Sequence, residues 1–193
     1  MARKKTKKNR SGFWFVIAIA FLMLTSTIGY VFKGGSSYKY NGFSFSGSED
    51  GRWIAKINGK NMIFYYHPEN LENINISQDI INNLKNTNMV YFTYDINNTY
   101  REDIAAINLE LSNILWNDFK IYSSNGLTSD NDFNIDIINC SNATKANPVI
   151  YYKKADNTSI DIQDYCIILN GRTGMEFMAL KERLLYGLYG VIE

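Results

Sequence analysis

The feature that most constrains this chain is an uncharged apolar run of 20 residues, Phe13–Phe32, close to the N-terminus. A helix rises about 1.5 Å per residue, so a run of this length spans the roughly 30 Å hydrocarbon core of a bilayer. We therefore predict a transmembrane helix at 13–32, which makes the chain a single-pass protein of the cell membrane.

The charges that flank this run predict its orientation. Six basic residues precede it within 1–12, and only Lys33 follows it immediately. Because basic flanks stay inside, we expect 1–12 to be a basic cytoplasmic segment and the C-terminal domain to be extracellular. A cleaved signal peptide is the alternative, but Thr27 and Gly29 make a poor cleavage pair, so an uncleaved signal-anchor is favoured. Either alternative exports the same domain.

The net charge of the whole chain conceals a difference between its basic N-terminal segment and its acidic remainder. The whole chain carries a net charge of +1, so residues 13–193 carry −5 once the six basic residues are set aside. The basic end suits the anionic inner leaflet of a bilayer. Because nucleic-acid binding would need a basic face on the folded domain, no nucleic-acid partner is expected. The expected partners are the lipid bilayer and other membrane or cell-surface proteins.

The exported part reads as a tether followed by one domain. Residues 33–37 contain two glycines and two serines and predict a flexible tether, and 38–193 has the length of one ordinary domain. Its two cysteines, Cys140 and Cys166, lie in an oxidising compartment and favour a disulfide. A redox pair is disfavoured because the spacing is not C-x-x-C.

The first part of the domain predicts an antiparallel meander. Asn41-Gly42 lies among aromatic residues, and Asn58-Gly59 separates the apolar runs 52–57 and 60–66. An Asn-Gly pair between such runs favours a two-residue type I′ hairpin, because both positions need positive φ. His67-Pro68 ends the last of these strands, since proline cannot donate to a ladder.

The rest of the domain alternates helices with strands. A short helix capped by Ser77 leads to a strand at 89–94 that is expected to be covered on both faces. The pattern Thr99–Glu102 then predicts a capping box for an amphipathic helix, and this strand-helix step is suited to begin a βαβ crossover. The remaining expectations are a short strand at 119–122, a polar loop at 125–132, alternation at 133–138, strands near 149–152, 160–162 and 165–169, and a helix at 174–191.

This order of elements predicts the fold class. We expect an α+β domain with one mixed, largely antiparallel sheet and about three helices. The aromatic residues are numerous, and most are expected in the core. Those that point outward would suit a protein- or sugar-binding surface.

The single histidine and one acidic segment are the first two candidates for a functional site. His67 is the only histidine, and one imidazole cannot build the His clusters of catalytic zinc. A surface or helix-capping role is favoured over catalysis.

Asp130–Asp136 has oxygens at alternate positions, as calcium loops do, but Ile135 and Ser141 stand where glycine and glutamate belong. A solvated loop that runs into a strand is favoured.

A third candidate is the segment Asn170–Gly174, which precedes the last predicted helix. Main-chain N–H groups at such a position can hold an anion, with help from Arg172. The segment lacks the Lys-Ser/Thr of a P-loop, so an ordinary turn is favoured. We therefore predict no catalytic, cofactor-binding or metal-binding residues.

Candidate glycosylation sites are Asn75, Asn97, Asn142 and Asn157, each in an Asn-x-Ser/Thr sequon. A fifth sequon, at Asn139, flanks a cysteine of the predicted disulfide, which would hinder modification there. The chain is so rich in Asn, Ser and Thr that several sequons are expected by chance.

The chain resembles a family of membrane-anchored proteins of small-genome archaea, for which no activity is known. The shared features are the basic start with its single span, the two cysteines and five short motifs: Tyr40–Phe45, Ile57–Lys60, Phe64–Pro68, Cys166–Gly171 and Arg183–Val191. These motifs are turns, strands and a helix. The resemblance therefore implies location and a single folded unit, and no mechanism.

The leading functional hypothesis is an anchored domain that acts by contact, as an interaction or accessory module at the cell surface. It rests on the sparse and wrongly spaced acids, bases and metal ligands. One alternative is a hydrolase or transferase with carboxylates brought together from distant positions. A further alternative is a pilin-like surface subunit, because Arg10-Ser11-Gly12 before the apolar run resembles a pilin processing site. A thiol–disulfide protein is a last alternative.

Overall fold

The computed structural model describes residues 14, 16–17, 19–23, 37–130 and 132–192. The chain divides into two units, 1–37 and 38–193. In the first unit the described residues 14, 16–17 and 19–23 are helical, whereas the basic segment 1–12 and most of the predicted span and tether lie outside the described residues. Within the part that is described, no helix has both the length and the apolar character needed to cross a bilayer.

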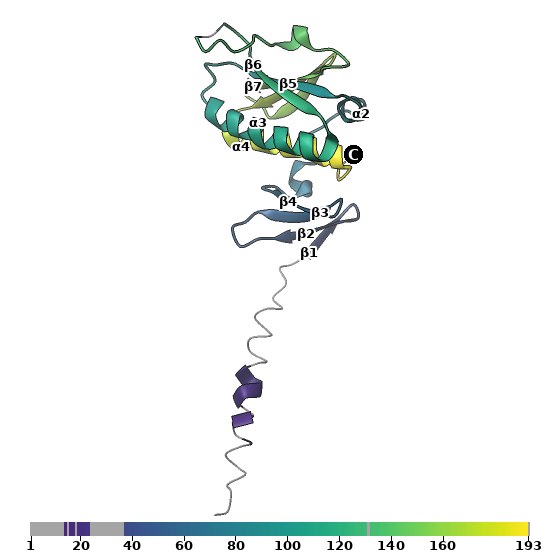
Figure 1. The fold of residues 1–193 in the computed structure, drawn as a ribbon, viewed down its shortest axis with the longest axis vertical. Coiled ribbons are helices and arrows are strands. Elements are labelled where there is room, and N and C mark those ends of the chain that lie inside the picture. The colour runs from purple at the N-terminus through teal and green to yellow at the C-terminus, as the bar shows by residue number, and fades with distance from the viewer. Residues whose placement is uncertain (1–13, 15, 18, 24–36, 131, 193) are drawn as a thin grey trace, which may run out of the picture. The chain divides into compact units, whose positions relative to one another are not determined.

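The second unit begins with a four-stranded meander in the order β1-β2-β3-β4 (Figure 1). Its strands are β1 (Ser37–Tyr40), β2 (Phe43–Gly47), β3 (Trp53–Ile57) and β4 (Lys60–Phe64). Ser37 therefore belongs to a strand and not to the tether. The β3–β4 turn has φ of 51° at Asn58 and 80° at Gly59, which confirms the predicted type I′ hairpin.

A second sheet has five strands in the order β6-β5-β7-β9-β8. Its strands are β5 (Met89–Tyr94), β6 (Tyr122–Leu127), β7 (Val149–Lys154), β8 (Ser159–Gln163) and β9 (Cys166–Gly171). The first four in this order run parallel, and β8 pairs antiparallel with β9. The α+β class with a mixed sheet is confirmed. The expectation of a single, largely antiparallel sheet is wrong, because the helix after β5 returns the chain to form a parallel pair.

Three α-helices are described in 37–192: α2 (Gln78–Lys85), α3 (Arg101–Ile114) and α4 (Gly174–Tyr189). Short helical turns occur at η1 (Pro68–Leu71), η2 (Leu115–Phe119) and η3 (Cys140–Asn142). Ser77 caps α2 as predicted, since its side chain accepts from the Asp79 N–H. The capping box predicted at Thr99 is wrong. The helix begins later, and the Asn98 side chain accepts from the Tyr100 N–H at 3.0 Å instead.

The predicted boundaries fail most clearly around β6. Of the short strand expected at 119–122, Phe119 ends the π-helical turn η2, Lys120 has a φ of 60°, and only Tyr122 lies in a strand. Strand β6 continues through the polar residues Ser123 and Ser124 into 125–127, which were expected in a loop. Pairing with the buried strand β5 outweighs the weak strand propensity of these residues. The alternating segment 133–138 contributes one isolated bridge, between Leu127 and Ile137.

Helix α4 is the centre of the core. It lies between the five-stranded sheet and the meander (Figure 1), and it is buried continuously from Ala179 to Leu188. Side chains from both sheets, including Phe45 and Phe64 of the meander and Phe92 and Tyr152 of the mixed sheet, belong to the same hydrophobic cluster. A helix covered all round must bury its polar positions too.

Three consecutive charged residues of α4 are buried, and each has a polar partner. Glu182 accepts hydrogen bonds from the N–H groups of Tyr65 and Tyr66 at 2.8 and 2.9 Å. Lys181 Nζ pairs with Glu110 Oε2 of α3 at 2.9 Å, and Arg183 Nε donates to the Ile74 carbonyl at 2.7 Å. These bonds connect α4 to the end of β4, to α3 and to the chain before α2.

The opposite face of the mixed sheet is covered by the long connection between β6 and β7. Cys140 in this connection forms a disulfide with Cys166 at the start of β9, as predicted. The disulfide lies beside a small buried cluster that includes Ile138 and Val149. Gly126 permits the close approach, because a Cβ there would meet the Ile138 side chain at 2.6 Å.

Removal of the disulfide is expected to destabilise the domain. The bridge closes a loop with a sequence separation of 26 residues, which corresponds to about 3 kcal/mol on the chain-entropy model. The double variant Cys140→Ser, Cys166→Ser should therefore show a lower free energy of unfolding in urea titrations. An unchanged midpoint would mean that packing alone holds the β6–β7 connection in place.

The burial of Glu182 predicts a pH-dependent stability. Burial raises the pKa of Glu182 from 4.5 to about 7, against the opposing effects of Lys181 and the two N–H donors. The folded state then binds this proton more tightly than the unfolded state. The resulting stabilisation is complete below about pH 4.5 and is lost as the pH rises through 7, by an amount on the order of 3 kcal/mol.

Urea titrations from pH 4.5 to 8 measure this dependence. The free energy of unfolding of the natural chain should fall across the range, and the slope should disappear in Glu182→Gln. The hydrogen bond from Arg172 lowers the pKa of the Glu176 carboxyl to about 2. The stabilisation that Glu176 contributes is therefore lost as the pH falls below 4.5, which is outside the range of this titration. Parallel profiles for the two proteins would contradict the assignment.

Candidate ligand-binding groove

The structure places His67 in the core and not on the surface. Its side chain is 5% exposed, and its ring lies 4.7 Å from the ring of Trp53 and 5.3 Å from that of Phe45, centroid to centroid. His67 occupies the N-cap position of η1 but makes no side-chain capping bond. The predicted surface position is therefore wrong, and the surrounding rings close the imidazole off from a substrate.

The described residues of the acidic segment, 130 and 132–136, lie at the surface. Asp130 and Asp132 are exposed and line a cavity of about 400 Å³ together with Ile96, Asn97 and Phe133. Within the described residues, no group of three or more His, Cys, Asp or Glu side chains is arranged to hold a metal ion. The segment is not a regular strand.

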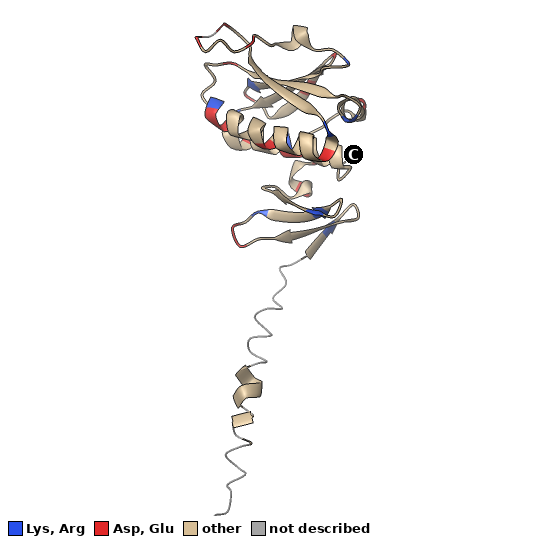
Figure 2. Ribbon diagram, in the orientation of Figure 1, with Lys and Arg blue, Asp and Glu red and all other residues tan. Residues whose placement is uncertain are grey.

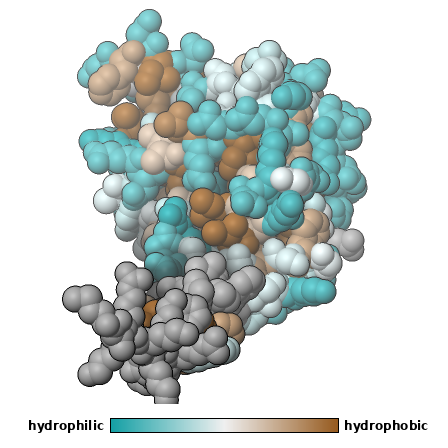
Figure 3. Space-filling view, turned by 60° about the horizontal axis from the view of Figure 1, so that its bottom comes forward, coloured by the Kyte–Doolittle hydropathy of each residue, from teal (hydrophilic) through white to brown (hydrophobic). Residues whose placement is uncertain are grey.

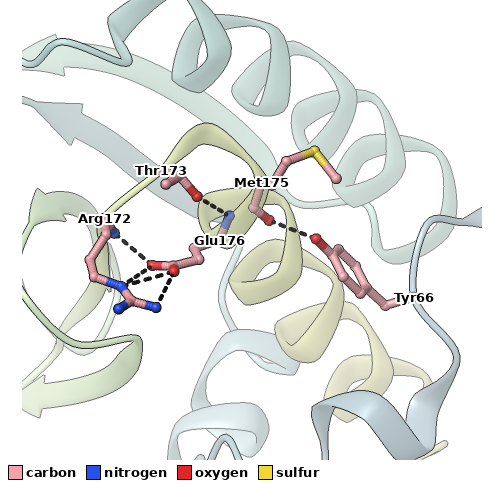
Figure 4. Close-up of polar contacts among 5 residues, drawn as sticks. All are labelled: Tyr66, Arg172, Thr173, Met175 and Glu176. Atoms are coloured by element: carbon pink, nitrogen blue, oxygen red, sulfur yellow. Dashed lines mark hydrogen bonds and ion pairs between the residues drawn. The ribbon is translucent and has the colours of Figure 1, made fainter.

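In the turn before α4, the Glu176 carboxylate is hydrogen-bonded to Arg172 (Figure 4). The Glu176 carboxylate accepts from the main-chain N–H of Arg172 at 2.7 Å and from the guanidinium Nη2 of the same residue at 2.7 Å. Thr173 caps α4, because its hydroxyl accepts from the Glu176 N–H at 3.2 Å. An internal carboxylate therefore fills the position that an external anion would take.

The four candidate glycosylation sites, Asn75, Asn97, Asn142 and Asn157, are all exposed, and they lie on separate segments of the domain. Asn142 is also engaged in the fold, since its side chain accepts from the Asn139 N–H at 2.8 Å. The structure therefore brings together only one set of the predicted residues, the two cysteines.

The carboxyl with the raised pKa is sealed from solvent. Glu182 is 0% exposed, and both of its oxygens accept from main-chain N–H groups. A general acid must reach the substrate proton directly or through one water. Glu182 therefore serves the fold and not catalysis.

A cavity of about 450 Å³ lies between α3 and β6, and we call it the α3–β6 groove. One wall is a single stripe of α3, formed by Ala105, Asn108, Leu109 and Ser112. Residues three, four and seven apart lie on one face of a helix, so these side chains point the same way. Because Ala105 and Ser112 have small side chains, this part of α3 leaves space open beside it.

The opposite wall is the edge strand β6. Ser123, Asn125 and Leu127 line the groove, and alternate residues of a strand share a face. The Ser123 hydroxyl donates to the Ser112 hydroxyl at 2.8 Å and joins the two walls at one end. Tyr94 and Ile135 complete the other end.

Asn108 is the unusual residue of the groove. It is 3% exposed, and neither its side-chain nitrogen nor its side-chain oxygen has a hydrogen-bond partner within the part of the chain that is described. A buried amide left unpaired costs about 1–3 kcal/mol. Such a group calls for an explanation, and a bound ligand or water would supply one.

The groove carries no formal charge. Its ten lining residues include no Asp, Glu, Lys, Arg or His. In the ribbon of Figure 2, Lys and Arg are spread among Asp and Glu. In the view of Figure 3, hydrophobic residues form small separate areas within a largely hydrophilic surface. The groove is therefore suited to a neutral molecule that forms hydrogen bonds.

Sequence reasoning missed this groove. It found the apolar stripe of α3 but not the asparagine between Ile107 and Leu111. A polar residue on the buried side of an amphipathic helix was the available signal. The other wall could not be found, because 123–125 was not recognised as a strand.

The unpaired amide predicts that Asn108→Leu does not destabilise the domain. Leucine has the branched shape of asparagine and removes two buried polar atoms that lack partners, so the free energy of unfolding should be unchanged or higher by about 1 kcal/mol. Urea titration of the two proteins measures this difference. A loss of more than about 1 kcal/mol would show that the amide is satisfied in the folded state, for example by a buried water.

Comparison with protein-family models, with curated proteins and with solved structures finds no match. The resemblance to archaeal membrane-anchored proteins therefore stays a prediction.

Proposed function

We propose that this chain is a single-pass membrane-anchored protein whose extracytoplasmic domain recognises a partner by non-covalent contact at the cell surface. The observation that carries the proposal is the contrast between two sites. The carboxyl with the raised pKa is sealed inside the core, whereas the α3–β6 groove, with its unpaired amide, is lined by neutral side chains.

The first support for the anchor is the apolar run 13–32 with its basic flank. A second support comes from the described part of this run, since residues 14, 16–17 and 19–23 are helical, as a helical span requires.

The support for an extracytoplasmic domain is the Cys140–Cys166 disulfide. Structural disulfides form and persist in oxidising compartments and are rare in the cytosol. The predicted orientation, with the basic end inside, places both cysteines on the oxidising side.

Recognition rather than catalysis is supported by the polar groups that line the groove. Two hydroxyl groups bonded to each other and an amide without a partner can donate and accept hydrogen bonds. Their ordinary reactivity is low, because neither serine has a histidine or lysine among the residues that line the groove.

The proposal is tested on the full chain in its native membrane. Protease treatment of intact cells should remove the domain, and affinity purification with a tag at the C-terminus should recover a specific partner. An inaccessible domain in intact cells would refute the anchored, outward-facing arrangement.

Catalytic turnover would contradict recognition as the function. The relevant variants are Asp130→Asn and Asp132→Asn, which remove the two exposed carboxylates that line one cavity. A substrate that is turned over by the natural chain and not by these variants would favour the hydrolase or transferase alternative.

A further inference from the structure

We propose that the α3–β6 groove binds a neutral carbohydrate, a mono- or disaccharide unit with free hydroxyl groups. This inference rests on the proposed function and names the chemistry of its ligand. The groove volume of about 450 Å³ falls in the range of small-molecule sites.

The absence of formal charge along the groove excludes several ligand classes. A phosphate, a carboxylate or a nucleotide would lose its hydration without gaining a countercharge, because the ten lining residues carry none. An apolar ligand would leave the Asn108 amide unpaired. The remaining class is a neutral molecule with several donors and acceptors.

Sugar hydroxyl groups match the polar groups of the groove. An asparagine side chain presents two N–H donors and a carbonyl acceptor, and each serine hydroxyl both donates and accepts. The Asn108 amide atoms are buried beneath the groove surface, so this side chain has to turn toward the groove before neighbouring sugar hydroxyls can donate to its oxygen and accept from its nitrogen. Asn125, which is exposed on β6, offers the same pair of groups on the opposite wall.

An aromatic pair lies close in sequence to the serine end of the groove, outside the residues that line it. Trp116, in η2, follows Ser112 by four residues, Tyr122 immediately precedes Ser123, and the two rings are 4.4 Å apart, centroid to centroid. Both rings are exposed, at 42% and 59%. An aromatic face combined with nearby polar groups suits a sugar ring, which has an apolar C–H face and a polar rim.

A peptide added to the edge of β6 fits less well. The outward main-chain groups of the strand are interrupted at Leu127, whose N–H donates to the Asp136 carbonyl at 2.9 Å and whose carbonyl accepts from the Ile138 N–H at 2.8 Å. Strand addition gains its affinity from a run of main-chain bonds. Only the short part of β6 before Leu127 remains for such a run.

The test measures sugar binding by the full chain in a detergent without a sugar head group. Glucose, galactose, mannose, N-acetylglucosamine and their disaccharides are screened by saturation-transfer NMR, and binders are titrated by calorimetry. At least one neutral sugar should bind, and glucose 6-phosphate and glucuronic acid should bind more weakly.

Variants locate the binding site. Asn108→Leu should weaken the affinity at least tenfold, which is about 1.4 kcal/mol, without loss of stability. Tyr122→Ala should weaken it as well, and because this ring is exposed the variant should remain folded. Asn113→Ala is the matched control, since Asn113 is an exposed asparagine of the same helix that does not line the groove.

Three results would overturn the inference: no binding to any neutral sugar, binding that is unchanged in folded Asn108→Leu, or competition for the groove by a peptide and not by a sugar. None of these results bears on the anchored recognition function itself. That function fails if the domain is inaccessible from outside, if no partner is recovered, or if the natural chain turns over a substrate.

Discussion

The fold depends on one buried acidic side chain, that of Glu182. Glu182 lies on the helix that separates the two sheets, and it holds the chain at the end of the meander through two main-chain N–H groups. The same segment is held again by the Tyr186 hydroxyl, which donates to the Tyr66 carbonyl at 2.7 Å, and by the Tyr66 hydroxyl, which donates to the Met175 carbonyl at 3.3 Å. The meander packs on α4 in one register because these directional bonds accompany non-directional apolar packing.

The groove is a consequence of how the other elements cover the mixed sheet. Helices occupy one face, and the β6–β7 connection, held by the disulfide, occupies the other. At the β6 edge, two of the residues that α3 presents, Ala105 and Ser112, are small, so helix and strand do not fill the space between them. The result is a cavity beside the Asn108 amide, which has no hydrogen-bond partner among the described residues, and functional sites are where such local conflicts are expected.

Patterns with a local cause were predictable from the sequence. The Asn58-Gly59 hairpin follows from positive φ at two adjacent residues, the Ser77 cap from a hydroxyl before an amphipathic run, and the strand 89–94 from continuous apolar character. Strand β6 was not predictable in this way. Ser123, Ser124 and Asn125 have weak strand propensity, and pairing with β5 determines their conformation. The groove was missed for the same reason, since one of its walls is this strand.

The sequence by itself determined an α+β domain with one pair of cysteines, turns at Asn41-Gly42 and Asn58-Gly59, and an amphipathic helix after the strand 89–94. The turns depend on adjacent residues, the helix depends on the spacing of its apolar residues, and the disulfide depends on the chain having two cysteines. Only the tertiary structure decided that the chain forms two sheets, that His67 is enclosed by rings, and that three charged residues of α4 are buried with partners. Those outcomes depend on contacts between residues far apart in the chain, such as Glu182 with Tyr65 and Tyr66, and no local pattern encodes such contacts.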